Sequence, residues 1–356
     1  MRVLPVADPF IIVPIVGLSG ISLFTIASTA PNLFISQLLF FLIGACALVI
    51  FSSTDFRVWA RSIGFIYIVC FAVLAITFLG PTVRGATRWI DVAFFRIQPS
   101  ELVKPFINIV FAKFFSNPRI SKFSSFVVPI LLFIPIIGLI FKQPDLGNVL
   151  VFLTIFISFT LISTIPILYI LMAGLTTTVL LPFIFKILKP YQRDRIISFL
   201  NPQADPIGAG YNALQSMIAI GSGQLLGLGL GRGTQSRLLF LPEYHTDFIF
   251  ASLVEELGFL GGSVVILFYI ILLGRILSIA FGSSDRYGKF LAIGVFSQFF
   301  IQVFINIGMN LGILPITGIT LPLVSYGGSS ILSSFIALGI IISIAKVNRA
   351  YPLVIR

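Results

Sequence analysis

The segment FLPEYHTDFIFASLVEELG, residues 240–258, places ionisable side chains at the edge of a long apolar stretch. Charged groups are costly in hydrocarbon, so those at its edge usually face protein, water or substrate. Asp247 is the best placed carboxylate for a general base, the group that takes a proton from a reacting hydroxyl. His245, the only histidine, is the alternative base, although a lone loop histidine more often serves as a hydrogen-bonding residue. Glu255 and Glu256 lie about two turns deeper, where we expect packing or polar-network roles.

A second constellation lies in GATRWIDVAFFRIQPSELVKP, residues 85–105. It carries several arginines, among them Arg88, and then Glu101 and Lys104. Because these last two residues are three positions apart, a helix would place them on one face. One interpretation is an ion pair that neutralises both charges at a helix end. The other, compatible with the first, is a cationic site for a diphosphate, in which Glu101 steers Lys104 or holds a metal ion.

Asp145 stands directly before an apolar span in KQPDLGNVL, residues 142–150. This position fits a carboxylate that caps the first turn of a helix. The alternative is that Asp145 joins Glu101 around a divalent cation such as Mg or Mn, because such ions prefer oxygen ligands. The sequence leaves both interpretations open, since it does not give the distance between the two carboxylates.

Two further segments have the composition of phosphate-binding sites. In YQRDRI, residues 191–196, Arg193 and Arg195 form either a solvated charge run or a phosphate clamp, since guanidinium groups bind phosphate bidentately. The glycine run GLGLGRGTQS, residues 227–236, is either a flexible turn or a loop whose backbone N–H groups approach a diphosphate or a sugar. It is not a Walker loop, because no Gly-Lys-Ser/Thr follows.

The composition excludes a soluble protein. The chain has 356 residues, of which 58% are hydrophobic and 10% charged, and its mean hydropathy is +1.10. A soluble protein of this length would carry far more surface charge. The net charge of +11 does not indicate a nucleic-acid partner, because no basic patch is interleaved with aromatic residues in a soluble domain. We expect contacts with membrane lipids instead.

The apolar runs predict an all-α integral membrane protein of about ten transmembrane helices. The expected spans are about residues 9–29, 33–51, 62–80, 98–115, 123–141, 147–164, 166–186, 248–281, 288–313 and 328–346. An even number of spans puts both termini on one side, and the distribution of Lys and Arg in short loops favours the cytoplasm. We expect residues 1–356 to form a single transmembrane domain.

One long loop, about residues 187–247, is predicted on the extracytoplasmic side. It opens with many turn signals, residues 186–210. The following YNALQSMIAIG, residues 211–221, reads as a short amphipathic helix that lies on the membrane or on the protein. Later in the chain, residues 306–330 combine prolines and glycines with apolar side chains. Such a non-helical segment at membrane depth must be buried in protein or line a cavity.

These motifs together resemble the SEDS family, the shape, elongation, division and sporulation proteins of bacteria. The matching motifs are GATRWI, QPSELVKP, QPDLG, the NP…DP…GYNALQS stretch, FLPEYHTDFIFASLVEELG and LPLVSYGGSS. They occur in the family's order and cover most of the chain. Within the family, GTQSRLLFLPEYHTDF and NIGMNLGILPITG are more similar to the RodA branch than to the FtsW branch.

The resemblance implies a peptidoglycan glycosyltransferase at the outer face of the bacterial cytoplasmic membrane. It would join lipid II, a disaccharide-pentapeptide on undecaprenyl diphosphate, into β-1,4 glycan strands for cell elongation and shape. The family's essential loop aspartate maps onto Asp247, the expected catalytic residue. The expected substrate-binding residues are Arg88, Trp89, Glu101, Lys104, Arg193, Arg195 and His245. The resemblance also implies a divalent cation with Glu101 and Asp145 as ligands, and no organic cofactor. The expected partner is a class B penicillin-binding protein.

The chain departs from the usual family pattern at three positions. Asn148 stands where Thr is common, Asp91 is an added acid, and Leu228 replaces a frequent Lys in the glycine run. The last change argues against a phosphate role for that run. Two other functions stay open at this point, which are a transporter that flips lipid II and a scaffold of the wall-synthesis complex. A transporter would favour polar groups near the bilayer midplane and pseudo-symmetric halves.

Overall fold

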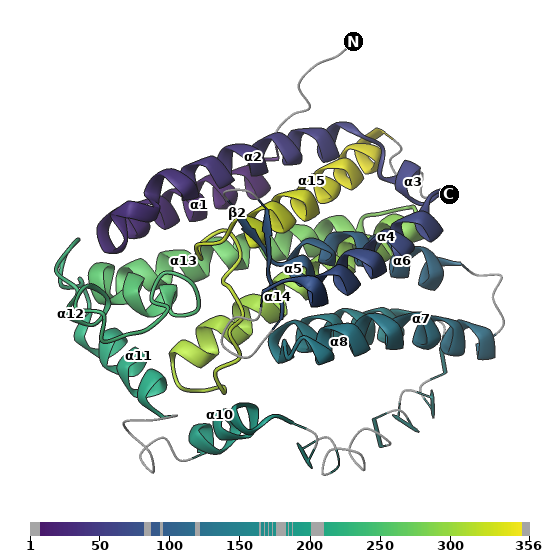
Figure 1. Ribbon diagram of the computed structural model, residues 1–356. Coiled ribbons are helices and arrows are strands. Elements are labelled where there is room, and N and C mark those ends of the chain that lie inside the picture. Colours follow the sequence, from purple (N-terminus) through teal and green to yellow (C-terminus); the bar gives the residue numbers. More distant parts are fainter. Residues whose placement is uncertain are drawn as a thin grey trace.

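Most of the chain folds into helices that run side by side in one bundle (Figure 1). The structure is a computed structural model of the chain. It describes residues 8–81, 87–92, 95–117, 122–163, 165–166, 168–169, 171–172, 174–175, 183, 185–186, 188–200 and 210–350.

The bundle consists of long helices joined by short ones. The long helices are α1 (Pro9–Thr29), α2 (Phe34–Ser53), α4 (Ile63–Ile76), α6 (Lys104–Ser116), α7 (Lys122–Lys142), α8 (Leu146–Ile162), α13 (Ile249–Phe281), α14 (Arg286–Asn310) and α15 (Gly328–Ala350). The short elements are η1 (Pro31–Leu33), α3 (Phe56–Trp59), η2 (Thr77–Leu79), α5 (Pro99–Leu102), α10 (Pro190–Leu200), α11 (Tyr211–Ser222) and α12 (Thr234–Arg237). Strands β1 (Ile90–Val92) and β2 (Phe95–Ile97) pair as an antiparallel hairpin.

Among the described residues, α14 and α15 are the most buried of the helices that are long and apolar enough to cross a membrane. Helix α14 packs against α6, α8 and α13, and α15 packs against α2. The peripheral α2 and α13 instead expose many leucine, isoleucine and phenylalanine side chains. An exposed apolar helix face is unfavourable in water but matches the hydrocarbon of a bilayer.

Within the described residues, five helices are long and apolar enough to cross a membrane, so the protein is a multi-pass membrane protein. They are Pro9–Thr29, Pro31–Ser53, Ile249–Phe281, Arg286–Asn310 and Gly328–Asn348. Shorter apolar helices cover Ile63–Leu79, Val127–Lys142 and Leu146–Ile162. The expected span 166–186 falls largely outside the described residues, so the number of ten spans stays a prediction.

The structure confirms several local expectations. The long helix expected at 248–281 is α13, the short helix expected in the long loop is α11, and the chain from residue 311 to 327 is not helical. The span expected at 98–115 differs, because it divides into α5 and α6. Pro105 stands in the first turn of α6, where its missing N–H costs nothing, and so starts a new helix.

Helix α10 and the β1–β2 hairpin were not predicted from the sequence. Helix α10 begins at Pro190 within the region that turn signals had marked as irregular. The β1–β2 hairpin adds strands to a protein expected to be all helical, and it pairs Asp91 with Arg96. Their side chains form an exposed ion pair, with Arg96 Nε and Asp91 Oδ1 2.8 Å apart. This cross-strand pair gives a structural role to the acid that departs from the family pattern.

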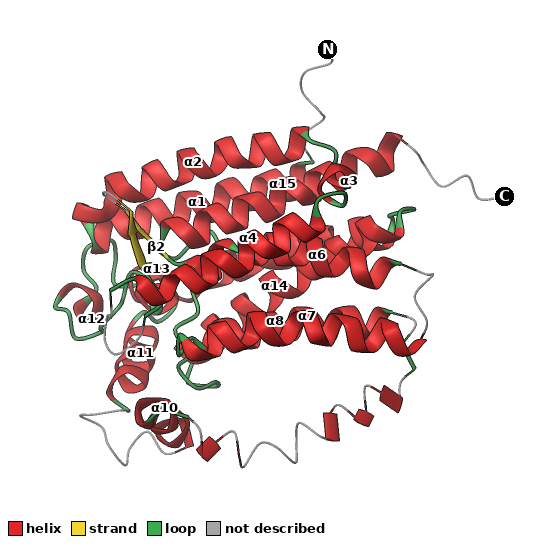
Figure 2. Cartoon of the chain, turned by 45° about the vertical axis from the view of Figure 1, so that its right-hand side comes forward, coloured by secondary structure: helices red, strands yellow, loops and turns green. Residues whose placement is uncertain are grey.

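The bundle has two chemically different ends. At one end, near α3, Asp8 bonds Arg275 across 2.6 Å and Arg57 pairs with Asp285 across 3.0 Å. Helices α10, α11 and α12 lie at the opposite end, as both views show (Figures 1 and 2). The candidate chemical groups of the sequence analysis gather at this second end.

Candidate functional site

Asp247 lies directly before α13, where the chain leaves the long loop. Its carboxylate faces the non-helical segment between α14 and α15, since a Cβ atom on Gly318 would lie 3.3 Å from Asp247 Oδ2. Gly318 has a φ of +73°, a backbone conformation that favours glycine. The segment can therefore pass close to the carboxylate, which it partly buries.

Burial raises the pKa of Asp247 to about 6, and the nearby Glu243 carboxylate raises it as well. Arg195 and Arg88 oppose this effect, because a positive charge stabilises the ionised carboxylate, and Asp145 adds a further small increase. Together with Asp247, these residues come from four different stretches of sequence, since Glu243 and Asp247 share one. The structure thus brings most of the separate candidate motifs within electrostatic range of one carboxyl group.

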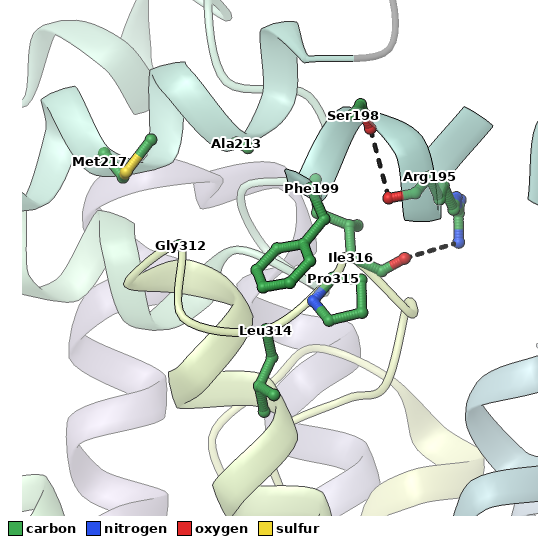
Figure 3. Close-up of a pocket in the computed structure, with 9 residues that line it drawn as sticks. All are labelled: Arg195, Ser198, Phe199, Ala213, Met217, Gly312, Leu314, Pro315 and Ile316. Atoms are coloured by element: carbon green, nitrogen blue, oxygen red, sulfur yellow. Dashed lines mark hydrogen bonds between the residues drawn. The ribbon is translucent and has the colours of Figure 1, made fainter. Parts of the chain in front are cut away.

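Arg195 reaches the site from α10. Its Nη1 atom donates to the carbonyl oxygen of Ile316, 3.4 Å away (Figure 3). The same close-up shows a small pocket beside it, which is mostly apolar. The pocket is lined by Arg195, Ser198, Phe199, Ala213, Met217, Gly312, Leu314, Pro315 and Ile316.

Arg193 does not join Arg195. Its guanidinium donates to the carbonyl oxygen of Lys186 and lies over the ring of Phe185, 5.8 Å from the centroid. Residues two positions apart on a helix point in different directions, so α10 separates the two arginines. The expected phosphate clamp formed by both side chains is therefore not supported by this geometry. Only Arg195 contributes to the surroundings of Asp247.

His245 is held by aromatic packing. Its ring lies between Tyr244 and Tyr326, with centroid distances of 5.0 Å and 5.7 Å. Burial lowers the pKa of His245, and the neighbouring Glu243 only partly offsets this effect. Its Nδ1 atom is buried and has no hydrogen-bond partner among the described residues. The imidazole is thus favoured in its neutral form and remains the alternative base.

Glu101 and Lys104 form the ion pair that their spacing predicted. Lys104 Nζ lies 2.6 Å from Glu101 Oε1, and the side-chain exposures are 0% and 5%. Side chains this deeply buried do not reach a ligand at the surface. The geometry supports the structural interpretation of the pair over direct binding of a diphosphate.

Asp145 caps α8, as one of its two interpretations predicted. Its Oδ2 atom accepts from Gln98 Nε2 at 2.8 Å, from Ser100 Oγ at 2.9 Å and from Asn148 Nδ2 at 2.9 Å. Asn148, a departure from the family pattern, is thus a third donor to this carboxylate. The network explains how a carboxylate can be 2% exposed although no ion pair with it is found among the described residues.

The donor sets of Glu101 and Asp145 do not fit a divalent cation. Three donors already point at Asp145 Oδ2, and the ammonium group of Lys104 stands against Glu101. Metal ions of this kind require oxygen ligands with free lone pairs. Among the residues that the structure describes, no group of three or more His, Cys, Asp and Glu side chains could hold a metal.

Glu255 and Glu256 bind the glycine run, which confirms their expected polar-network role. Glu255 accepts from Gln235 N at 2.8 Å and from Ser236 Oγ at 2.9 Å. Glu256 Oε1 accepts from Ser28 Oγ at 2.6 Å and from Gly231 N at 2.9 Å. The two carboxylates therefore fix the long loop to α13.

The glycine run fills a break in α13. Gly258 has a φ of +70°, which interrupts the helix about two turns after its start. Leu228 N and Gly229 N donate to the freed carbonyl oxygens of Glu255 and Glu256, at 2.9 Å and 3.0 Å. Because these N–H groups are already bonded to carbonyl oxygens of α13, the run does not present them to a phosphate. We call the glycine run the plug, since it fills the break in the helix.

Arg88 and Trp89 lie in the chain just before β1, and both are partly buried. Arg88 faces the site closely enough to lower the pKa of Asp247. Trp89 instead meets the preceding helix end, since a Cβ on Gly80 would lie 2.5 Å from its carbonyl oxygen. The structure therefore brings Arg88, but not the backbone of Trp89, toward the carboxylate.

Glu243 was recognised from the sequence as one of the ionisable side chains of residues 240–258, but no role was predicted for it. Its φ is +51°, unusual for a residue with a side chain, and its carbonyl oxygen accepts from Thr246 N and Phe248 N. This turn directs the chain into α13 and sets Asp247 at the helix start. A short polar run before an apolar span was the available signal.

The fold and the site define a class of protein, a multi-pass helical membrane protein with a buried carboxylate and facing arginines at one end of the bundle. A model of the FtsW, RodA and SpoVE family, described as "Cell cycle protein", matches residues 4–350. The chain is 40% identical to peptidoglycan glycosyltransferase MrdB of Escherichia coli K12 over 85% of this chain and 82% of that protein. It is 39% identical to stage V sporulation protein E of Bacillus subtilis, over 88% of this chain and 87% of that protein. The chain belongs to the SEDS family.

Solved structures agree with this assignment. One similar chain comes from the solved structure "Structural coordination of polymerization and crosslinking by a peptidoglycan synthase complex". The two chains are 26% identical and superpose with a TM-score of 0.83, and the match covers 97% of this chain and 99% of the other. RodA of Thermus thermophilus matches with a TM-score of 0.73 and 24% identity, covering 96% of this chain and 97% of its own, and shows the shared fold.

Proposed function

We propose that this protein is a peptidoglycan glycosyltransferase that joins the disaccharide units of lipid II into β-1,4 glycan strands, and that Asp247 is its general base. The observation that carries the proposal is the carboxylate of Asp247, whose pKa is raised to about 6 beside two arginines. A general base works best when its pKa lies near the working pH. Relatives that carry the name peptidoglycan glycosyltransferase support the choice of reaction.

The reaction is a single displacement. The 4-hydroxyl oxygen of the acceptor GlcNAc attacks the anomeric carbon of the growing glycan, which is α-linked to its lipid diphosphate. The new C–O bond forms as the bond to the diphosphate oxygen breaks, and the hydroxyl proton passes to the Asp247 carboxylate. The electron pair of the broken bond leaves with the diphosphate. Because attack comes from the opposite face, the α-linkage becomes β.

Arginine side chains stabilise the leaving group in this mechanism. Negative charge develops on the departing diphosphate, and preorganised cations lower the energy of that transition state. Arg195 and Arg88 are the cations that act on Asp247 in the structure. Arg195 is also fixed against the carbonyl oxygen of Ile316, which preorganises it. We assign it as the main diphosphate contact.

The proposed setting is the bacterial cytoplasmic membrane, with the site facing outward and both termini in the cytoplasm. The clusters at the two ends of the bundle support this orientation, since Arg57 and Arg275 lie at the end opposite α11 and α12. A class B penicillin-binding protein, which crosslinks the peptides, is the proposed partner. The similarity to a chain of a peptidoglycan synthase complex supports this pairing.

The test uses the purified protein, alone and with a candidate class B penicillin-binding protein, supplied with lipid II and a divalent cation. Glycan length is measured for the wild type and for Asp247→Ala. We expect polymer from the wild type and a loss on the order of 100- to 10,000-fold in the variant, the usual contribution of a general base. Asp194→Ala, which removes an exposed carboxylate from α10, is the matched control and should retain activity.

Equal polymer from Asp247→Ala would reject the base assignment and direct attention to His245. A different result separates polymerisation from transport. If wild-type protein, with its partner, makes no polymer but moves lipid II across vesicle membranes, the transporter function replaces the proposed one. Vesicles with fluorescent lipid II measure that movement directly.

A further inference from the structure

Asn306 and Asn310 lie one helical turn apart near the end of α14, and both side chains are fully buried. Neither residue was assigned a role from the sequence. A buried amide group costs free energy unless it is hydrogen-bonded, so its partners indicate why it is there.

Both amides bind the backbone of Asp247. Asn306 Nδ2 donates to the carbonyl oxygen of Asp247 at 3.0 Å, and Asn310 Nδ2 donates to the same oxygen at 3.1 Å. A carbonyl oxygen has two lone pairs, so these two bonds fill its capacity. The backbone of Asp247 is therefore held at one carbonyl oxygen by two positions of the buried helix α14.

Asn306 also fixes the segment that covers the Asp247 carboxylate. Its Nδ2 atom donates to the carbonyl oxygen of Ile319 at 2.7 Å. Ile319 follows Gly318, where an added Cβ would lie 3.3 Å from Asp247 Oδ2. One amide group thus holds both the carboxylate-bearing residue and the chain packed against it.

Asn310 caps α13 from a different helix. Its Oδ1 atom accepts from Ala251 N at 3.1 Å, one of the N–H groups in the first turn of α13. The residue at the helix start, Phe248, makes no side-chain cap of its own. A first-turn N–H without a partner is unfavourable, so Asn310 supplies the missing acceptor and fixes the direction in which α13 begins.

We propose that Asn306 and Asn310 are positioning residues, which fix the backbone of Asp247 so that its carboxylate keeps a productive orientation toward the acceptor hydroxyl. They act through Asp247 and do not touch the substrate. The inference rests on the proposed function in one respect, that Asp247 is the base. It adds that α14 fixes the geometry of the base together with the turn at Glu243.

The matched control is Asn108 on α6, another fully buried asparagine. Its Nδ2 atom donates to Gln298 Oε1 on α14 at 3.0 Å. Gln298 precedes Asn306 by eight positions, about 12 Å along the helix axis. Asn108→Ala therefore removes a buried amide bonded to the same helix without removing a contact to Asp247.

The experiment compares Asn306→Ala, Asn310→Ala and Asn108→Ala in the full-length protein. It measures kcat and KM for lipid II polymerisation across pH, and the Tm in detergent. For the first two variants we expect kcat to fall on the order of 100-fold with KM unchanged, since a displaced catalytic group costs rate and not binding. The acid limb of the rate profile should move below pH 6, because a freed carboxylate becomes better hydrated. Asn108→Ala should lower the Tm and leave both kcat and the pH of the acid limb unchanged.

A purely structural role would give a different pattern. If Asn306→Ala and Asn310→Ala lower Tm as Asn108→Ala does, but keep kcat and the acid limb of the wild type, the positioning role is rejected. Should Asn310→Ala not yield folded protein, Asn306→Leu decides the question by the same two readouts, because it nearly keeps the side-chain size, removes the donor and adds no charge. Full activity in Asp247→Ala would overturn the assignment of Asp247 as the base, and this inference with it.

Discussion

At the scale of single residues, the carboxyl groups of the site differ in how deeply they are buried and in which groups bind them. Asp247 is partly buried and has a raised pKa, whereas Asp145 is buried within a network of donors and Glu101 against an ammonium group. Residue type alone could not show which of the three carboxylates is the base, because each belongs to an acidic residue next to an apolar span. Their hydrogen-bond partners separate a reactive group from two structural ones.

The buried pair of Glu101 and Lys104 illustrates the cost of such placement. Two charges lose their hydration on burial, and their attraction offsets this loss only when the geometry is good. A separation of 2.6 Å meets that condition. Removal of one partner alone would leave an unpaired buried charge, typically at a cost of about 3–5 kcal/mol. An effect of either single substitution on activity would therefore report folding before it reported catalysis.

A prediction at this scale concerns Arg195. Its positive charge lowers the pKa of Asp247, so Arg195→Gln should raise that pKa above about 6. Because the base acts in its ionised form, the acid limb of the rate profile should then move to higher pH. The measurement is the rate of glycan formation between pH 5 and 9, compared with the wild type.

Arg193→Gln serves as its control, since Arg193 turns toward Lys186 and Phe185. We expect the limb of this variant to stay at the wild-type pH. If both variants moved the limb equally, the charge of α10 as a whole would be responsible, and the specific pairing of Arg195 with Asp247 would be wrong.

At the scale of elements, the break in α13 connects the long loop to the membrane-spanning part. The first segment of α13, residues 249–257, is almost wholly buried and directly follows Asp247. The glycine run supplies the donors that this break requires. A broken helix in an apolar span is tolerated only where other protein groups satisfy its backbone. The loop is thus part of the support of the site.

A substitution at Gly258 tests this connection. A Cβ there would lie 2.3 Å from Gly227 N and 2.5 Å from Leu225 O, and these backbone atoms cannot move without breaking the plug. The positive φ adds strain of roughly 1–3 kcal/mol for a residue with a side chain. We expect Gly258→Ala to lower the Tm and to speed hydrogen exchange across residues 223–237.

Gly274 on the same helix is the matched control, because no atom lies within 4 Å of an added Cβ. Gly274→Ala should keep or slightly raise the Tm, since alanine restricts the unfolded chain and favours helix. Equal losses of stability at both positions would mean that α13 tolerates no side chain at either glycine, and the plug would not be the cause.

At the scale of the whole molecule, the two ends of the bundle differ in chemistry. One end holds the Asp8–Arg275 and Arg57–Asp285 pairs, and the other holds the hairpin, α10, α11 and α12 with Asp247. A substrate that is exposed outside the cell must meet the second end. The orientation of the bundle is therefore a requirement of the proposed function.

Cysteine labelling checks this orientation. Thr234 and Ser284 are exposed at opposite ends of the bundle, and the native Cys46 and Cys70 can be replaced first. In spheroplasts, a membrane-impermeant maleimide should label Thr234→Cys, whereas Ser284→Cys should react only after the membrane is opened. The reverse pattern would place Asp247 in the cytoplasm and exclude polymerisation at the outer face.

The amino-acid sequence by itself determined the membrane class, the positions of helices such as α1, α11 and α13, and the choice of Asp247. Transfer of an apolar run into lipid depends on local composition, and so does the unfavourable burial of an isolated charge. The motifs that carry the family resemblance are also local. For these features no knowledge of distant contacts was needed.

Only the tertiary structure decided which charges surround Asp247 and which are structural. Arg88 and Arg195 reach it from distant segments of the chain, and α10 turns Arg193 away. The roles of Asn306 and Asn310 depend on bonds to a residue some sixty positions earlier in the chain. Electrostatic and hydrogen-bond energies fall off within a few ångströms, so spatial distance sets their strength, and sequence spacing gives that distance only within a single helix or hairpin.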